Sequence, residues 1–193
     1  MRIIGGQLSG RKILAPDGSV TRPITDRVKQ SLFDVVAPQI ESALVYDCFA
    51  GTGSMGLESL SRGAAFLTFF ESHRPALARL NQNVVALELT GRSRIVGGDL
   101  FRWFKQSISR PGSTQASGAD LVFLDPPYRF LRERSAELQA LAGHLVGTHL
   151  RPDATIVFRH ARDDTLELPG LRRYDLREYG EMAIEFLRAD GEK

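Results

Sequence analysis

Short apolar segments alternate with longer segments of helical periodicity through most of this chain. Four apolar segments have the length and composition of buried strands, at 44–46, 66–70, 94–96 and 121–124. Segments with helical periodicity separate the first three and follow the third, at 54–62, 75–89 and 100–106. Because strands joined by helical crossovers pair in parallel, the alternation predicts an α/β fold with a largely parallel sheet.

Further elements are predicted on either side of this alternation. A helix is expected to begin at Thr25 or Asp26, where a side chain can cap it. Another helix is expected over 132–146, and strands over 154–158, 174–179 and 183–187, the last two antiparallel around Gly180. Segments 2–4 and 11–14 flank a glycine-rich turn and predict a small basic hairpin. We therefore divide the chain into an arm, 1–24, and a main domain, 25–193.

Composition favours a single globular unit. The chain has 193 residues, of which 42% are hydrophobic, enough for one core but not for a second domain. One cysteine, Cys48, excludes a disulfide framework, and the histidines lack ligand spacing, so no metal is expected. With neither a signal-peptide core nor about 18 consecutive apolar residues, the sequence predicts a cytoplasmic protein without a membrane span.

Positive charge is concentrated in the first thirty residues. Six basic residues stand there against two acidic ones, a balance of +4, whereas the whole chain carries +2. The basic residues are Arg2, Arg11, Lys12, Arg22, Arg27 and Lys29. Arg27 and Lys29 lie off the apolar stripe of the predicted helix. Such a segment favours a polyanionic partner, and a solvated terminus is the alternative.

Each of the four apolar strands leads to an acidic residue at or shortly after its end. These residues are Asp47, Glu71, Asp99 and Asp125. In parallel sheets, ligands bind beyond the carboxyl ends of the strands. Any one of the acids could cap a helix, but four together are hard to explain as caps. We therefore expect a ligand site at this edge.

A glycine loop follows the first strand. Gly51, Gly53 and Gly56 have the G-x-G-x-x-G spacing, and Glu71 lies twenty positions beyond Gly51. A dinucleotide would fit this spacing, which leaves an NAD-binding oxidoreductase open. Asp47 would repel a pyrophosphate but would attract the ammonium and sulfonium groups of S-adenosylmethionine. Its ribose diol suits Glu71, and Asp99 is placed to bind an adenine amino group, with Leu100 and Phe101 beside the ring.

The motif Asp125-Pro126-Pro127-Tyr128 follows the fourth strand directly. Two prolines stiffen this turn and remove two N–H donors, so it presents hydrogen-bond acceptors. If the Asp125 carboxylate and the Pro126 carbonyl accept the hydrogens of an exocyclic base amine, its lone pair is directed towards an incoming methyl group. Tyr128 would supply a flat surface for a base held out of its stack. A stiff turn with a surface tyrosine is the alternative.

These motifs resemble those of known enzymes. Residues 47–53 and 125–128 resemble the donor and catalytic motifs of class I amino-methyltransferases, including adenine and cytosine enzymes that act on DNA. A narrower resemblance lies in the order of RIIGG at 2–6, GRK at 10–12, TRP at 21–23, TDRV at 25–28 and LF at 32–33. This order is similar to that of the RsmD family of 16S ribosomal RNA guanine-N2 methyltransferases.

The resemblance implies a fold, a donor and an acceptor. The fold is the Rossmann-like, seven-stranded class I methyltransferase fold, the donor is S-adenosyl-L-methionine, which becomes S-adenosyl-L-homocysteine, and the acceptor is a guanine of 16S rRNA. We expect the rRNA in the small ribosomal subunit or its assembly intermediate, and a monomeric enzyme. A DNA adenine-N6 or other amino-methyltransferase and a non-catalytic RNA-binding scaffold remain alternatives.

It also implies site residues. The donor-site positions are Asp47, Phe49, Ala50, Gly51, Thr52, Gly53, Glu71, Ser72, Asp99, Leu100 and Asp125. The catalytic motif is Asp125, Pro126, Pro127 and Tyr128. Arg22 and Arg27 match the family's basic entrance to the substrate site, and with Arg2, Arg11 and Lys12 they are the predicted RNA contacts. The sequence departs from the family at Ile24, often a hydroxyl residue, and in an insert over 107–118.

Overall fold

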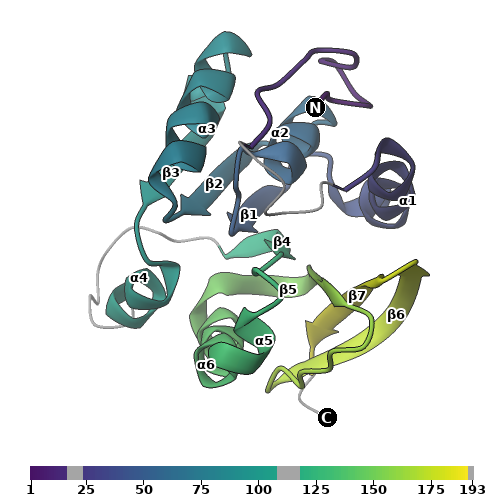
Figure 1. The fold of residues 1–193 in the computed structure, drawn as a ribbon, viewed down its shortest axis with the longest axis vertical. Helices are drawn as coiled ribbons and strands as arrows, with labels where there is room; N and C mark the ends of the chain where they lie inside the picture. Colours follow the sequence, from purple (N-terminus) through teal and green to yellow (C-terminus); the bar gives the residue numbers. More distant parts are fainter. Residues whose placement is uncertain (17–23, 108–117, 191–193) are drawn as a thin grey trace.

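Seven strands form one mostly parallel sheet (Figure 1). A computed structural model describes residues 1–16, 24–107 and 118–190. The strands are β1 (Leu44–Cys48), β2 (Phe66–Glu71), β3 (Ser93–Gly97), β4 (Ala119–Leu124), β5 (Leu150–Ala161), β6 (Leu171–Tyr179) and β7 (Met182–Ala189). Their order is β3-β2-β1-β4-β5-β7-β6, with β7 antiparallel to both its neighbours. The predicted α/β fold and the antiparallel final pair are confirmed.

Helices cover both faces of the sheet (Figure 1). The helices are α1 (Asp26–Val36), α2 (Ser54–Ser61), α3 (Arg74–Ala86), α4 (Leu100–Ser107), α5 (Phe130–Glu133) and α6 (Ser135–His144). Short turns are the 3-10 helices Ala37–Gln39 and Thr90–Arg92 and the π-helix Leu145–His149. Helices α1, α2 and α3 pack on one face, and α4, α5 and α6 on the other. No helix within the described ranges is long and apolar enough to cross a membrane.

The helix predicted over 132–146 is wrong in its extent, because the chain breaks at Arg134. This residue adopts φ −133° and ψ 31° between α5 and α6. Its guanidinium lies over two aromatic rings, 4.3 Å from the centroid of Phe101 and 4.9 Å from that of Phe130. Phe101 belongs to α4, so the contact that accompanies the break joins residues far apart in the sequence.

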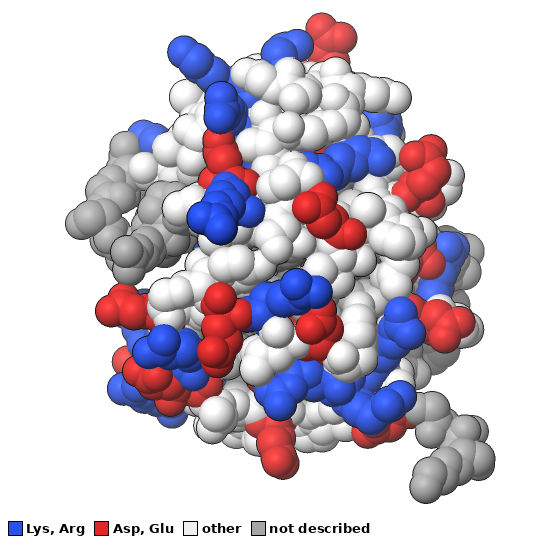
Figure 2. Space-filling model, turned by 90° about the vertical axis from the view of Figure 1, so that its right-hand side faces the viewer, with Lys and Arg blue, Asp and Glu red and all other residues white. Residues whose placement is uncertain are grey.

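The outer strand β6 is exposed and carries charges of both signs. Figure 2 shows the side of the molecule that lies to the right in Figure 1, where basic and acidic side chains are mixed. Arg173 pairs with Glu185 at 3.0 Å, and Arg177 pairs with Asp175 at 2.9 Å. Charged residues on an edge strand discourage pairing with another chain.

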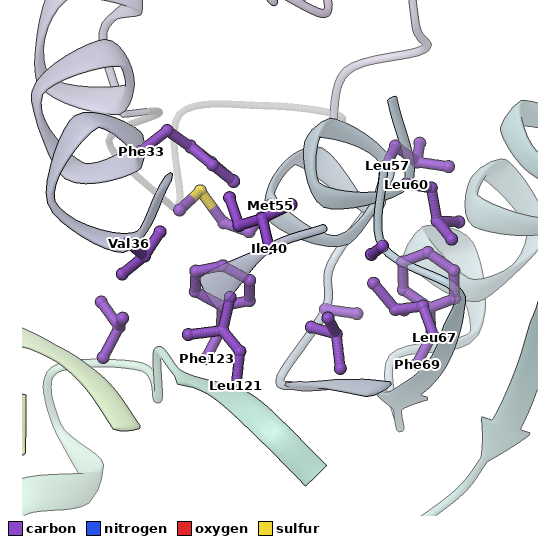
Figure 3. Packing of buried hydrophobic residues seen from close by; sticks show 14 of the residues in the cluster. Phe33, Val36, Ile40, Met55, Leu57, Leu60, Leu67, Phe69, Leu121 and Phe123 are labelled. Carbon is purple, nitrogen blue, oxygen red and sulfur yellow. The ribbon is translucent and has the colours of Figure 1, made fainter. Parts of the chain in front are cut away.

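Alternation along the strands divides the core into two layers. Leu121 and Phe123 on β4 face the layer beneath α1 and α2, whereas Val122 and Leu124 belong to the layer beneath α4 and α6. In the first layer the rings of Phe33 and Phe123 lie 5.8 Å apart (Figure 3). Because both faces of the central strands are covered, the sequences of these strands are almost continuously apolar.

The N-terminal segment packs against this core. One antiparallel bridge joins Arg2 to Lys12, and Ile3 and Ile13 are buried in the same layer as α1 and α2. The described part of the segment is therefore a closed loop anchored by apolar side chains. The division into an arm, 1–24, and a separate domain stays a prediction.

A buried carboxylate holds this segment in place. Glu58 on α2 is fully buried and accepts hydrogen bonds from the backbone N–H groups of Ile4 at 2.9 Å and Gly5 at 2.7 Å. Two cations balance its charge, Arg62 at 2.8 Å and Lys29 at 3.0 Å. The prediction that Lys29 lies on the polar side of α1 is wrong: the side chain is 2% exposed because it reaches this carboxylate.

Replacing Lys29 with methionine is expected to destabilise the fold. The change leaves Glu58 buried with Arg62 as its remaining described cation, and breaking a buried ion pair costs about 3 kcal/mol. Urea denaturation measures the free energy of unfolding. Lys105→Met on the exposed side of α4 is the control, and an equal loss in both variants would contradict the role given to Lys29.

Candidate active site

The carboxyl ends of β1, β2 and β4 bring three acids to one edge of the sheet. Asp47 is the fourth residue of β1 and Glu71 is the last of β2, so both lie within strands rather than after them. Asp125 follows β4, which neighbours β1. The negative charges of Asp125 and Glu71 both raise the pKa of Asp47, which places the three side chains in one electrostatic site.

The glycine loop between β1 and α2 is a turn with left-handed backbone. Phe49, Gly51 and Gly53 have φ angles of 74°, 57° and 90°. A Cβ atom on Gly53 would lie 2.6 Å from Leu80 Cδ1, whereas one on Gly51 would meet open space. The loop therefore combines close packing beneath Gly53 with room for a ligand over Gly51.

Glu71 fastens this loop to the next strand. Its Oε2 accepts from Gly51 N–H and its Oε1 from His73 N–H, both at 2.6 Å. Two further predicted donor-site residues lie near this loop. Thr52 is buried and its carbonyl accepts from the Asn83 side chain at 2.9 Å, whereas Ser72 is exposed. The loop is thus held in shape by hydrogen bonds before any ligand enters.

Asp47 lies beneath the loop. Its side chain is buried and its Oδ2 accepts from Gly56 N–H at 2.9 Å. Burial raises the pKa of Asp47 to about 7; the Gly56 hydrogen bond opposes the rise, and the charges of Asp125 and Glu71 add to it. A cationic ligand would relieve this charge, whereas a phosphate would increase it. The site therefore fits the ammonium and sulfonium groups of S-adenosylmethionine.

Asp99 caps α4 in the structure. Its Oδ1 accepts from the N–H groups of Phe101 at 2.8 Å and Arg102 at 3.3 Å, and its Oδ2 lies 3.5 Å from Arg134. The side chain is half exposed and each oxygen retains acceptor capacity. Adenine recognition by Asp99 stays a prediction. Leu100 is buried in the core below α4.

Phe49 and Phe101, both predicted beside the ligand, belong to an aromatic cluster whose other members, Phe130 and Arg134, sequence reasoning missed. Phe49 lies 5.9 Å from Phe101 and 6.0 Å from Phe130 between ring centroids, and Arg134 covers Phe101 and Phe130. The spacing of Phe130 and Arg134, four residues apart, was the available signal. This cluster gives the loop an apolar wall suited to a flat ring.

The Asp125 turn leads into α5. The Pro127 carbonyl accepts from Phe130 N–H at 2.7 Å, so this carbonyl is engaged in the start of the helix. Tyr128 is partly exposed. Both oxygens of Asp125 accept from Arg159 on β5, at 2.6 Å from Nε and 2.6 Å from Nη2. Arg159 was missed because the fifth strand was expected to end at residue 158.

Comparison with known proteins agrees with this geometry. A family model described as Conserved hypothetical protein 95 matches residues 1–188. The chain is 41% identical over 129 residues to "Ribosomal RNA small subunit methyltransferase D" of Escherichia coli strain K12, covering 67% of this chain and 61% of that protein. A protein of the same name from Haemophilus influenzae is 34% identical over 170 residues, covering 88% and 83% of the two chains.

The structural comparison points the same way. The solved structure of yhhF from Escherichia coli, named as a candidate methyltransferase, has a TM-score of 0.80 and 30% identity, with 100% of this chain and 99% of that chain covered. The family model covers nearly the whole chain. This chain belongs to the Conserved hypothetical protein 95 family.

This is the RsmD family that the motifs predicted. The aligned region spans 61% of the length of the Escherichia coli relative. The predicted class I methyltransferase fold is confirmed by the sheet and by its structural relatives. The acids and the glycine loop described above fit S-adenosylmethionine, the predicted donor.

The predicted RNA contacts of this RsmD family member differ from one another in their exposure and in their partners within the chain. Arg22 lies outside the described residues. Arg2 pairs with Asp26 at 2.8 Å, and Arg11 donates to the carbonyl of Ala86 at 3.0 Å. Lys12 and Arg27 are exposed. Their role in binding RNA stays a prediction.

The raised pKa of Asp47 is expected to make stability fall as pH rises. In the folded chain this group holds its proton up to about pH 7, whereas in the unfolded chain it loses the proton near its ordinary value of 3.8. Folding is therefore penalised increasingly from about pH 4 through pH 7. Between pH 5.5 and 7.5 the ligand-free protein should lose about 2 kcal/mol of stability relative to Asp47→Asn.

Chemical denaturation across this pH range checks the expectation. Asp163→Asn, which changes an exposed carboxylate, serves as the control. Parallel stability curves for the wild-type chain and Asp47→Asn would show that Asp47 does not titrate in this window.

Proposed function

We propose that this protein transfers a methyl group from S-adenosyl-L-methionine to the exocyclic N2 amine of a guanine in 16S rRNA of the small ribosomal subunit. The observation that supports this most strongly is the acceptor-rich turn at Asp125, set beside the acidic glycine-loop site on neighbouring strands. The RsmD names of the relatives support rRNA as the substrate.

The donor half of the site holds a cationic ligand. Asp47 faces its positive charge, the backbone around Gly51 leaves space for it, and Glu71 retains acceptor capacity for ribose hydroxyls. S-adenosylmethionine supplies a methyl group on a positively charged sulfur. Because such a transfer needs alignment above all, the preformed loop contributes by positioning.

The acceptor half orients the amine. The Asp125 carboxylate keeps lone pairs beyond those that Arg159 uses, and within the described residues the Pro126 carbonyl receives no hydrogen bond. These two acceptors bind the two amine hydrogens and direct the nitrogen lone pair away from the turn. After transfer the amine loses one proton, which the Asp125 carboxylate is placed to accept. Tyr128 offers its exposed ring to the flipped base.

The N-terminal segment and the first turn of α1 supply the RNA contacts in this proposal. Lys12 and Arg27 bind phosphates, with Arg22, and Arg2 and Arg11 add charge nearby. A substrate presented by the small subunit or its assembly intermediate would bring further contacts. We propose that the protein acts as a monomer in the cytoplasm, where ribosomal subunits assemble.

Methyl mapping tests the proposal. The protein is incubated with labelled S-adenosylmethionine and small subunits that lack the modification, and the rRNA is analysed by mass spectrometry. We expect one methyl group on guanine N2. Label on a DNA adenine with none on rRNA would refute the rRNA assignment, and failure to bind S-adenosylhomocysteine in calorimetry would favour a non-catalytic scaffold.

Replacing Asp125 with alanine is expected to lower the single-turnover rate by about 10²-fold or more, because the amine loses the group that orients it. Affinity for S-adenosylhomocysteine should fall only modestly. Asp163→Ala is the control, since it removes an exposed carboxylate outside the acidic edge of the sheet. Unchanged turnover in Asp125→Ala would refute the role of this carboxylate.

Replacing Arg27 with alanine is expected to weaken binding of the subunit several-fold, with a smaller salt dependence, because one phosphate contact is lost. Affinity for S-adenosylhomocysteine should stay near the wild-type value. Filter binding at several salt concentrations measures the effect. Loss of donor affinity alone would contradict a role in RNA binding.

A further inference from the structure

Arg159 forms a two-point ion pair with the proposed amine-orienting carboxylate. Its Nε and Nη2 atoms each lie 2.6 Å from one oxygen of Asp125. The side chains are 15% and 23% exposed, so water screens the pair only in part. Such fork-shaped contacts fix the orientation of a carboxylate more tightly than a single hydrogen bond.

The surroundings of this pair are mainly apolar. A small cavity of about 10 Å³ touches both charged side chains. Its other lining residues are Ile24, Leu32, Met55, Phe123 and Val157. An ion pair in such a place adds little stability over apolar residues of similar size. Stability alone therefore gives a weak reason for a guanidinium at this position.

A second pair joins the same two strands and gives a comparison. Arg151 lies near the start of β5 and Asp120 near the start of β4, at the other edge of the sheet from Arg159 and Asp125. The two side chains are 3.1 Å apart and are 39% and 28% exposed. Asp120 also accepts from Leu44 N–H at 2.8 Å, so this pair has an ordinary structural task. The Arg159 pair lies where the sheet carries its functional acids.

The three acids of this edge are stabilised in different ways. Asp47 and Glu71 accept from backbone N–H groups, whereas Asp125 faces a full positive charge. Burial lowers the pKa of Arg159, but the Asp125 carboxylate outweighs this effect and the pKa is raised, so the guanidinium stays charged. Asp125 thus has a permanent counter-ion next to two other acids.

We infer that Arg159 is a positioning residue for methyl transfer, which holds the Asp125 carboxylate in one orientation while leaving each oxygen a lone pair for the base amine. The inference rests on the proposed role of Asp125. It assigns to Arg159 no contact with the donor, and its effect passes through the carboxylate.

Arg159→Met and Arg159→Lys test this inference, with Arg151→Met as the matched control. In the methionine variant we expect the single-turnover rate at saturating rRNA to fall about 10- to 100-fold, with KM for S-adenosylmethionine nearly unchanged. KM for rRNA should also stay nearly unchanged, because the lost contact orients the carboxylate and does not touch the substrate. Arg159→Lys, which keeps a cation but not the two-point contact, should restore part of the rate.

Three outcomes would overturn the inference. The first is a wild-type single-turnover rate in Arg159→Met. The second is a loss confined to KM for rRNA, which would make Arg159 a substrate contact. The third is an equal effect of Arg151→Met, which would indicate a structural role.

A measurement without RNA separates this inference from the proposed function. Protein with ¹³C-labelled aspartate gives a carboxyl signal for Asp125 that Asp125→Asn identifies by its loss. At fixed pH this signal should change its chemical shift in folded Arg159→Met, because the carboxylate loses its two-point contact, and should stay in place in Arg151→Met. An unchanged signal in Arg159→Met would overturn the inference whatever the acceptor is, whereas absence of methyl transfer by the wild-type chain would refute the proposed function alone.

Discussion

The buried carboxylate of Glu58 joins the N-terminal segment to α1 and α2. It binds the backbone of Ile4 and Gly5, the ammonium of Lys29 on α1 and the guanidinium of Arg62 at the end of α2. A charge fully removed from water must be balanced, so these elements cannot separate without a large energetic cost. Because α2 begins at the glycine loop, the same interaction steadies the donor site.

The acids at the sheet edge explain why this loop suits a cation rather than a pyrophosphate. The raised pKa of Asp47 reflects burial together with the charges of Asp125 and Glu71. Backbone N–H groups donate hydrogen bonds to Glu71 and Asp47, and the guanidinium of Arg159 balances the charge of Asp125. A positively charged ligand completes the balance. The proposed donor binding and amine orientation would thus depend on one electrostatic arrangement across β1, β2 and β4.

Much of the fold and of the site could be predicted from local patterns. Apolar runs and helical spacing predicted the strands, the start of α1 at Thr25 or Asp26 and the edge that carries the acids; the structure places the cap at Thr25. Other features depend on residues far apart in the sequence. Arg134 lies over Phe101 where α5 and α6 separate, Lys29 turns inward to Glu58, and Arg159 meets Asp125. Periodicity reports which side of an element is apolar, but not which partner a charged side chain meets.

The sequence by itself therefore determined the fold class, the edge that carries the acids and the RsmD family, since these follow from the alternation of strands and helices along the chain, glycine spacing and short motifs. Only the tertiary structure decided that Asp99 caps α4, that an aromatic cluster stands beside the loop, and that Asp125 has a guanidinium as its counter-ion. The physical reason is that burial and charge pairing are properties of neighbours in space, and the order of strands in the sheet sets who those neighbours are.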